Sequence, residues 1–151
     1  MKPELSYVIY VGTEPQKVWD ALVSPEGVKA IFFGCALDTT FEIGAPYRYI
    51  GPGSEGDETV HVYGNILAFE QNKVMSYTEH PGPSYNENHA NLETRVTLTL
   101  DQVGNSTKVT LINDEWPDDH PSYERTRESW PIIMSNVKTY AETGKTMDMG
   151  F

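Results

Sequence analysis

The polar side chains that could carry chemistry in this chain alternate with apolar residues along its predicted strands. If the apolar residues face the interior, the same alternation turns tyrosines, carboxylic acids and an amide inward, with one arginine on a helix. This inward set is Tyr7, Tyr47, Tyr49, Tyr77, Glu79, Asn113, Glu115 and Arg127. A carboxylate that is buried without a partner either costs free energy or takes up a proton. The set therefore predicts a polar anchor inside an otherwise apolar cavity.

Two carboxylic acids of this set, Glu79 and Glu115, fall at predicted strand ends, where Arg127 could pair with either. With a pKa moved toward neutrality by burial, Glu79, Glu115 or Tyr77 could act as a general acid or base. Two other interpretations stay open from the sequence. The charges could form a satisfied internal salt bridge, or one bulge could shift the alternation and turn the carboxylates to solvent.

The other reactive side chains form no metal or nucleophile motif. His80, His89 and His120 fall in predicted loops and lack the close spacing of zinc ligands. Cys35 is the single cysteine, which excludes an internal disulfide and fits a reducing compartment. The sequence also lacks a nucleophile elbow and a phosphate-binding glycine loop. We therefore predict no metal and no cofactor.

Composition and charge set the broad class of the protein. Its 151 residues, 38% hydrophobic and 11% aromatic, predict one domain over 1–151 with an ordered core of about 4–144. The formal net charge of −11 argues against nucleic acids and anionic membranes, because both require a basic surface. The chain has no apolar run long enough for a membrane helix and no signal-peptide h-region. These features predict a cytoplasmic monomer or homodimer.

The element expected to position the polar set is a long helix over 121–143. Its large apolar side chains recur at three-and-four spacing, which is typical of a helix with one buried stripe. They are Tyr123, Trp130, Ile133, Met134, Val137, Tyr140 and Ala141. Pro121 is expected at the first helical position and Gly144 just after the last. Pro131 predicts a kink or break, with Ser129 capping the second half.

The rest of the chain reads as one strand, two short helices and an antiparallel meander. The first strand is expected over Leu5–Val11, with Thr13 as the N-cap of the first helix and Ser24 as that of the second. Turn residues separate six further strands, predicted over 37–41, 47–50, 59–69, 74–79, 94–101 and 108–114. The predicted fold class is therefore α+β, a curved antiparallel sheet around a long C-terminal helix.

Three loops are expected to border a cavity between this helix and the sheet. Alternate strand ends of a meander lie together, so the loops 51–58, 80–91 and 114–120 should gather beside the start of the helix. Long loops at one edge are the usual entrance to a ligand site. Trp130 and Met134 of the helix complete the predicted ligand-binding set.

Several of these segments resemble the family related to the C-terminal domain of the Hsp90-ATPase activator. The most specific is a Pro-x-x-Val-Trp helix after an apolar strand, within 7–22. Weaker similarities follow in the same order over 44–49, 64–66, 74–78 and 107–111, and end with Trp130 ahead of Ile133 and Val137. The resemblance implies the helix-grip fold of the Bet v 1-like, START-like (SRPBCC) superfamily. This chain departs from the family at 31–33, where relatives often have tryptophan, and at Asn113, where many have histidine.

The resemblance and the predicted cavity leave three functional classes open. The first is a cytosolic carrier or sensor that binds a small lipophilic molecule, such as a lipid, mainly through burial of apolar surface. The second is an enzyme in the same cavity, of the cyclase, dehydratase or hydrolase type known in the superfamily. The third is an Hsp90-activator-like interaction or stress-response module, which would use an exposed face.

Overall fold

A computed structural model describes residues 1–53 and 55–149, so Ser54 of the predicted loop 51–58 lies outside the described residues. Seven antiparallel strands form one sheet, in the order β1-β7-β6-β5-β4-β3-β2. In chain order the elements are β1 (Leu5–Val11), α1 (Pro15–Val23), α2 (Pro25–Ile31), β2 (Ala36–Thr39), β3 (Pro46–Pro52), β4 (Glu58–Glu70), β5 (Val74–Pro81), the 3-10 turn η1 (His89–Asn91), β6 (Thr94–Val103), β7 (Ser106–Asp114) and α3 (Tyr123–Thr143).

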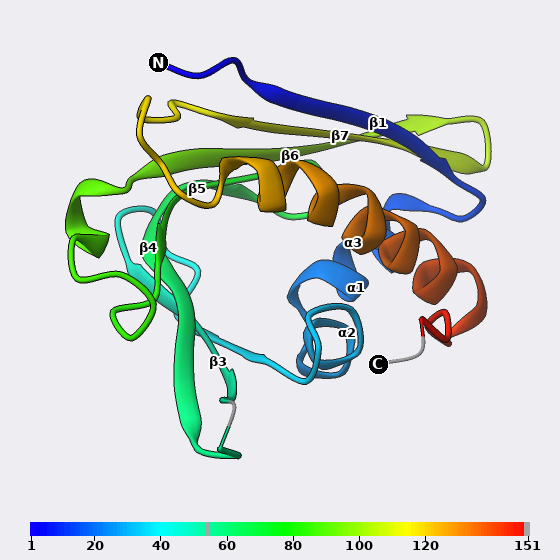
Figure 1. The fold of residues 1–151 in the computed structure, drawn as a ribbon. Helices are drawn as coiled ribbons and strands as arrows, with labels where there is room; N and C mark the ends of the chain where they lie inside the picture. Colours follow the sequence, from blue (N-terminus) through cyan, green and yellow to red (C-terminus); the bar gives the residue numbers. More distant parts are fainter. Residues whose placement is uncertain (54, 150–151) are drawn as a thin grey trace.

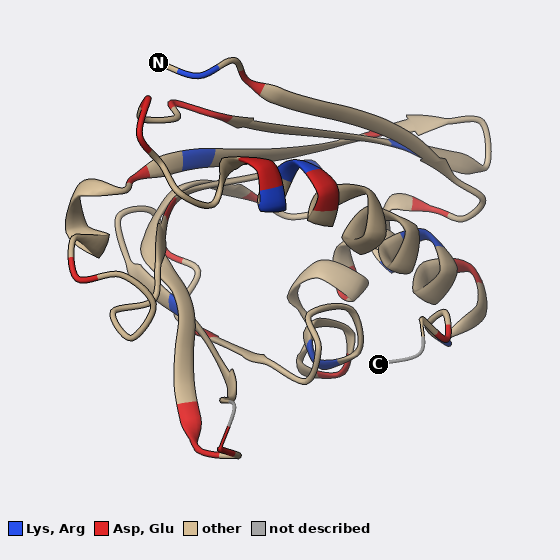
Figure 2. Cartoon of the chain, in the orientation of Figure 1, with Lys and Arg blue, Asp and Glu red and all other residues tan. Residues whose placement is uncertain are grey.

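The sheet curves around α3, and α1 and α2 close the remaining side (Figure 1). β1 and β7 are paired along their whole length, so the first and last strands of the chain are neighbours. This is the helix-grip fold that the sequence predicted. Acidic side chains mark the tip of the β3–β4 hairpin and the segment that leads into α3 (Figure 2).

The two short helices form where the sequence predicted them, but the first begins differently. Pro15 occupies the first turn of α1, and the residue that caps it is Glu14, not Thr13. The backbone carbonyl of Thr13 instead accepts a hydrogen bond from the Thr107 hydroxyl at 2.8 Å, which ties this residue to β7 before the helix starts. The Ser24 hydroxyl accepts from the Gly27 amide at 3.0 Å, which confirms Ser24 as the cap of α2.

The predicted start of α3 at Pro121 and the predicted break at Pro131 with Ser129 as a second cap are wrong. The helix begins at Tyr123 after Ser122, so Pro121 lies outside it, and it continues through Pro131 without a break. Ser129 does not cap a second segment, because its hydroxyl donates to the carbonyl of Arg125 at 2.8 Å within the helix. Gly144 ends the helix in the left-handed region at φ 77°, as predicted.

A contact with the first strand compensates the missing amide hydrogen of Pro131. A proline cannot donate to the carbonyl four residues earlier, which here is the carbonyl of Arg127. The Tyr7 hydroxyl on β1 donates to that carbonyl at 2.8 Å. The predicted inward tyrosine of β1 is therefore a link between strand and helix, and it satisfies a backbone group that the sequence left without a partner.

We predict that this link has a measurable free energy that depends on Pro131. Tyr7→Phe should lower the free energy of unfolding by about 1 kcal/mol, because it removes the donor to the Arg127 carbonyl. In a Pro131→Ala background the new amide at position 131 can donate to that carbonyl, so Tyr7→Phe should cost much less. Urea unfolding of the wild type, the two single variants and the double variant measures the coupling free energy between the two positions. If Tyr7→Phe costs the same free energy with proline and with alanine at position 131, the proposed compensation is contradicted.

Candidate functional site

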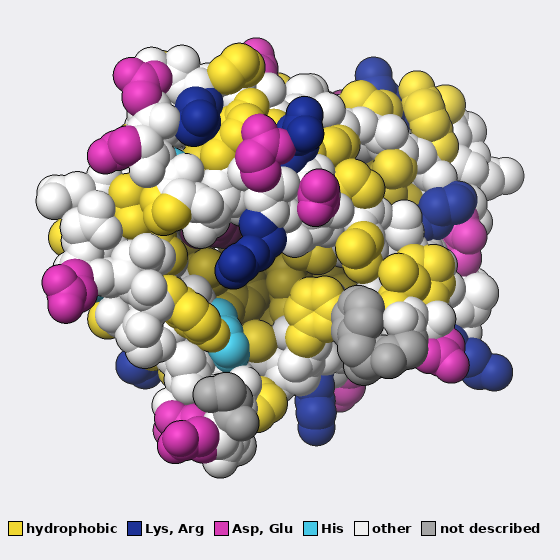
Figure 3. Space-filling model, viewed as in Figure 1, with side chains coloured by type: hydrophobic (Ala, Val, Ile, Leu, Met, Phe, Trp, Pro, Cys, Tyr) yellow, Lys and Arg dark blue, Asp and Glu magenta, His cyan; other side chains and the backbone are white. Residues whose placement is uncertain are grey.

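A hollow lies between the sheet and the first half of α3, where the helix presents small side chains. Thr126 and Ser129 face the sheet there, whereas Trp130, Met134 and Val137 of the following turns are buried in the core. The space-filling view shows this hollow lined by hydrophobic side chains and open on one face of the molecule (Figure 3). The hollow therefore exists because the apolar stripe of α3 is interrupted by two small polar residues.

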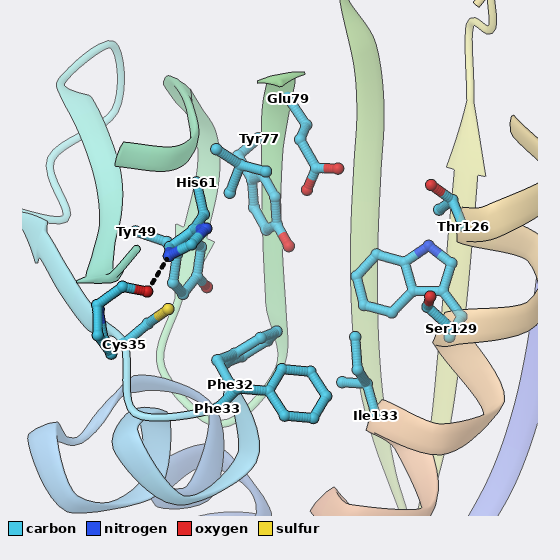
Figure 4. A pocket seen from close by; sticks show the side chains of 13 residues that line it. Phe32, Phe33, Cys35, Tyr49, His61, Tyr77, Glu79, Thr126, Ser129 and Ile133 are labelled. Atoms are coloured by element: carbon cyan, nitrogen blue, oxygen red, sulfur yellow. Dashed lines mark hydrogen bonds between the residues drawn. The ribbon is translucent and has the colours of Figure 1, made fainter. Parts of the chain in front are cut away.

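The hollow has two chambers. The inner chamber has a volume of about 320 Å³ and is lined by Phe32, Phe33, Cys35, Tyr49, Pro52, His61, Val62, Tyr77, Glu79, Thr126, Ser129, Trp130 and Ile133 (Figure 4). The outer chamber, of about 470 Å³, is lined by His61, Val62, Glu79, Pro81, Tyr85, Asn86, Trp116, His120, Pro121, Ser122, Arg125, Thr126 and Ser129. They meet at a neck, which we define as their shared residues His61, Val62, Glu79, Thr126 and Ser129.

Two of the three loops expected at the mouth line the outer chamber, whereas the loop 51–58 reaches the hollow only through Pro52 of the inner chamber. Tyr85 and Asn86 of the loop 80–91, and Trp116 and His120 of the segment 114–120, line the outer chamber. The first loop connects β5 to β6 and the second segment connects β7 to α3, so both lie at the same end of the sheet, as the meander predicted. The inner chamber is more apolar than the outer one, since aromatic and aliphatic side chains form most of its wall.

Aromatic rings form the sheet side of the inner chamber. The ring of Tyr77 lies 5.0 Å from that of Tyr47, and the ring of Tyr49 lies 4.9 Å from that of Phe32. Burial raises the pKa of the Tyr49 and Tyr77 hydroxyls well above the usual tyrosine value, so both stay protonated. This wall is rigid, apolar and uncharged.

Glu79 is the acidic group at the neck. It lies on β5 opposite Thr94 of β6, and its carboxyl group points into the space between Tyr77 and the α3 residues Thr126 and Ser129 (Figure 4). Within 1–53 and 55–149 no hydrogen bond or ion pair reaches this carboxyl group, and burial raises its pKa to about 7. The side chain lies deep in the protein but keeps some exposure because it faces the hollow. It is therefore an unpaired acid poised between its two protonation states near neutral pH.

Asn113 fixes the position of two tryptophans that line the hollow. Its side chain is fully buried, and the Trp130 indole donates to its Oδ1 at 3.0 Å. The Asn113 Nδ2 donates to the Arg95 carbonyl at 3.0 Å and to the Thr94 hydroxyl at 3.3 Å, which attaches this amide to β6. The Trp116 indole donates to the Asn113 backbone carbonyl at 2.9 Å. Asn113 thus lies behind the wall rather than in the chamber.

Two charged residues of the predicted set point away from the hollow. Glu115 has a left-handed φ of 62°, which ends the strand alternation, and its exposed carboxylate lies 3.5 Å from Arg95 on the outer side. The exposed guanidinium of Arg127 lies 2.8 Å from Glu124 in the same helix. The predicted pairing of Arg127 with Glu79 or Glu115 is therefore wrong, and so is the inward orientation of Glu115.

The remaining predicted residues divide between wall and core. Tyr49, Tyr77, Glu79 and Trp130 line the inner chamber. Tyr47 lies behind it, with its hydroxyl donating to the Thr78 carbonyl at 2.6 Å. Met134 is buried in the core below the chamber.

Sequence reasoning missed several lining residues, some of which have a physical signal. Tyr49 pairs with Val62 but Ile50 pairs with Val60, so His61 is an extra residue in a β-bulge of β4. The bulge lets the consecutive residues His61 and Val62 both reach the hollow, which strict alternation forbids. Phe33 follows α2 with φ 52°, and strand periodicity does not apply there.

The histidines are held by hydrogen bonds around the mouth. His61 contacts the Pro52 carbonyl at 3.2 Å and the Tyr85 hydroxyl at 2.6 Å. His80 contacts the His89 carbonyl at 2.9 Å and the Glu93 carboxylate at 3.0 Å. Among the described residues no group of three or more histidine, cysteine or acidic side chains is arranged to hold a metal ion. The histidines therefore position the loop 80–91 against β4.

We predict that Glu79 makes the stability of the free protein depend on pH. The pKa of Glu79 is about 7 in the folded protein against 4.5 for an ordinary glutamate. Between these values the folded state binds more protons, so the free energy of unfolding falls as pH rises and levels off above 7. At about 1.4 kcal/mol per pH unit the loss is at most about 3 kcal/mol. Removing this ionisation should therefore stabilise the protein above pH 7.

The test compares the wild type with Glu79→Gln in urea unfolding at pH 5 and pH 8. The variant should gain stability over the wild type at pH 8 and very little at pH 5. Glu128→Gln on the exposed side of α3 is the matched control and should give the same difference from wild type at both pH values. A Glu79→Gln difference that does not change with pH would contradict the raised pKa.

We also predict that the Asn113 side chain orients Trp130 without orienting Trp116. Asn113→Leu should lower the free energy of unfolding by about 2–4 kcal/mol, because it leaves the buried Trp130 indole without an acceptor. Hydrogen exchange of the two indole N–H groups, followed by NMR, should show faster exchange for Trp130. The indole of Trp116 is an internal control because its acceptor is a backbone carbonyl; equal acceleration of both would contradict the specific role.

Comparison with solved structures identifies the fold. The Aha1 dimer from Colwellia psychrerythraea is similar at 17% identity and a TM-score of 0.72, over 95% of this chain and 99% of that one. A protein of Cytophaga hutchinsonii is 21% identical with a TM-score of 0.74, over 95% and 97% of the two chains. DynU16, a putative protein in the dynemicin biosynthetic locus, matches 97% of this chain and 49% of its own at 17% identity and a TM-score of 0.72.

The sequence comparisons identify the family. None of the curated proteins searched matches the chain. No helix in the described part of the chain combines the length and the apolar character that a membrane span requires. One family model, described as activator of Hsp90 ATPase homolog 1-like protein, matches residues 12–142. Because this match covers most of the chain and agrees with the helix-grip fold, the protein belongs to the Hsp90-ATPase activator homolog 1-like family.

Proposed function

We propose that the protein binds a small lipophilic molecule in the hollow between α3 and the sheet. The single observation that supports this most strongly is the inner chamber, an apolar space of about 320 Å³ beside a well-packed core. Because the hollow is open on one face, its apolar wall is in contact with water in the free protein. A ligand that covers this wall would remove apolar surface from water, which is favourable.

The size and shape of the hollow limit the size and the chemical class of the ligand. A volume of about 320 Å³ lies at the lower end of small-molecule sites. It corresponds to roughly ten water volumes, or an apolar group of about that many heavy atoms. The aromatic wall of Tyr49, Tyr77 and Phe32 favours a flat group, and the open outer chamber leaves room for a polar end. Apolar burial at roughly 25 cal/mol per Å² would supply most of the affinity.

Filling the neck should abolish binding. Ser129 lines both chambers, so Ser129→Phe should occupy the space that a ligand needs. We expect the affinity for a neutral apolar dye such as Nile red to fall at least about tenfold, while thermal unfolding stays cooperative. Fluorescence titration of the purified protein measures the affinity.

The chain offers a matched control for this variant. Ser135 is also on α3, and its hydroxyl donates to the carbonyl four residues earlier at 2.7 Å, but its side chain faces solvent. Ser135→Phe should therefore leave dye binding unchanged. Equal binding by the wild type, Ser129→Phe and Ser135→Phe would show that the dye binds elsewhere and would contradict the proposal.

An enzyme acting in the same hollow is the second candidate, and Glu79 is the observation that favours it. Its pKa of about 7 suits a general acid or base, and it faces the space in which a ligand would lie. Glu79→Gln distinguishes the two functions by turnover rather than by affinity. An enzyme would lose turnover of the ligand that the variant still binds, whereas a binding protein shows no turnover with either form.

Membership of the family also supports an Hsp90-activator-like interaction as an alternative. Such an interaction would use an exposed face rather than the hollow. Ser129→Phe should then leave capture of Hsp90 unchanged while it abolishes dye binding, which separates the two activities.

A further inference from the structure

The neck of the hollow contains an acid without a base. Of the residues that line the inner chamber, none is lysine or arginine, and the ionisable ones are Glu79, His61, Cys35 and the two tyrosines. Two arginines flank Thr126 on α3, and Arg127 pairs with Glu124 on the exposed side. Arg125 lines the outer chamber, which Glu79 also borders, but no ion pair joins the two side chains. Glu79 therefore faces the chamber without an internal countercharge among the described residues.

The groups around Glu79 cannot replace such a countercharge. Within the described residues no hydrogen bond joins the hydroxyl of Tyr49 or Tyr77 to the Glu79 carboxyl group, and the Tyr47 hydroxyl donates to the Thr78 carbonyl. Both ring nitrogens of His61 are engaged, one by the Pro52 carbonyl and the other by the Tyr85 hydroxyl. The carboxyl group of Glu79 thus keeps its capacity to accept hydrogen bonds, and it points toward the place where a ligand would lie (Figure 4).

The aromatic wall favours the same kind of partner as the carboxylate. The faces of tyrosine, phenylalanine and tryptophan attract cations, and here Tyr77, Tyr49 and Trp130 line the chamber that Glu79 borders. A carboxylate beside such rings is a suitable environment for an ammonium group, which would gain a charge-assisted hydrogen bond. The whole chain adds to this preference, because 22 acidic residues against 11 basic ones attract cations at long range.

We propose that the hollow binds a lipophilic amine, with the apolar group in the inner chamber and the ammonium nitrogen at the Glu79 carboxylate. This inference rests on the proposed function and names the class of its ligand. It also excludes a class, since a fatty acid or another lipophilic carboxylate would place a second negative charge beside Glu79. The polar outer chamber remains available for a further substituent of the amine.

Three naphthalene compounds that differ only in one substituent test the proposal. They are 1-naphthylmethylamine, 1-naphthylmethanol and 1-naphthoate, whose ring system of ten carbons suits the volume of the inner chamber. Calorimetric titration at pH 8 should give an affinity for the amine about tenfold above that for the alcohol, because hydrogen bonds to a charged group are the stronger ones. The carboxylate should bind more weakly than the alcohol.

Two variants locate the effect. Glu79→Gln should remove the advantage of the amine, so that the amine and the alcohol bind the variant with similar affinity. Glu128→Gln removes the same charge from the exposed side of α3 and should preserve the order, which controls for net charge. An amine that binds no better than the alcohol, or an order that survives Glu79→Gln, would overturn this inference and leave the proposed function in place. Absence of binding by all three compounds would overturn both.

Discussion

The site depends on one buried amide, because Asn113 is where the sheet, the last helix and the segment between them are joined. Its side chain accepts from Trp130 of α3 and donates to β6, and its backbone carbonyl accepts from Trp116. A buried amide that lost these partners would cost the full desolvation of each group, so the arrangement is strongly specified. The two indoles line different chambers, so the same residue holds one side chain of each chamber wall in place.

The two halves of α3 face different surroundings. The second half buries Met134 and Val137 in a closed core, and the first half presents Thr126 and Ser129 to an open space. Glu79 lies opposite these small side chains, without the partner that a buried carboxylate normally has. Proteins usually depart from close packing and from the pairing of buried polar groups at functional sites. An unfilled volume and an unpaired acid occur here at the same place, and for this reason we assign function to the neck.

The architecture could be predicted well from the sequence, because strands and helices follow from the periodicity of the apolar residues. The alternation in β1 and β6, the stripe of α1 and the glycine after α3 all appear where expected. Which individual side chains face the hollow was harder to predict, because their orientation depends on local irregularities of the backbone. The bulge at His61 and the left-handed conformation of Glu115 each shift the alternation by one residue. The hydrogen bond that compensates Pro131 within α3 comes from Tyr7, a residue of another element, and no local pattern contains that information.

The link between Tyr7 and the Arg127 carbonyl spans 120 residues of sequence and has a consequence for how the protein is made. On the ribosome the first strand emerges early, but its partners β7 and α3 are synthesised last. Until then β1 has neither its neighbour β7 nor the helix α3 to pack against. Contacts between residues so far apart in the sequence form slowly. The hollow can therefore assemble only after translation of α3 is complete. The ligand that we propose would then be captured by the finished protein rather than by the nascent chain.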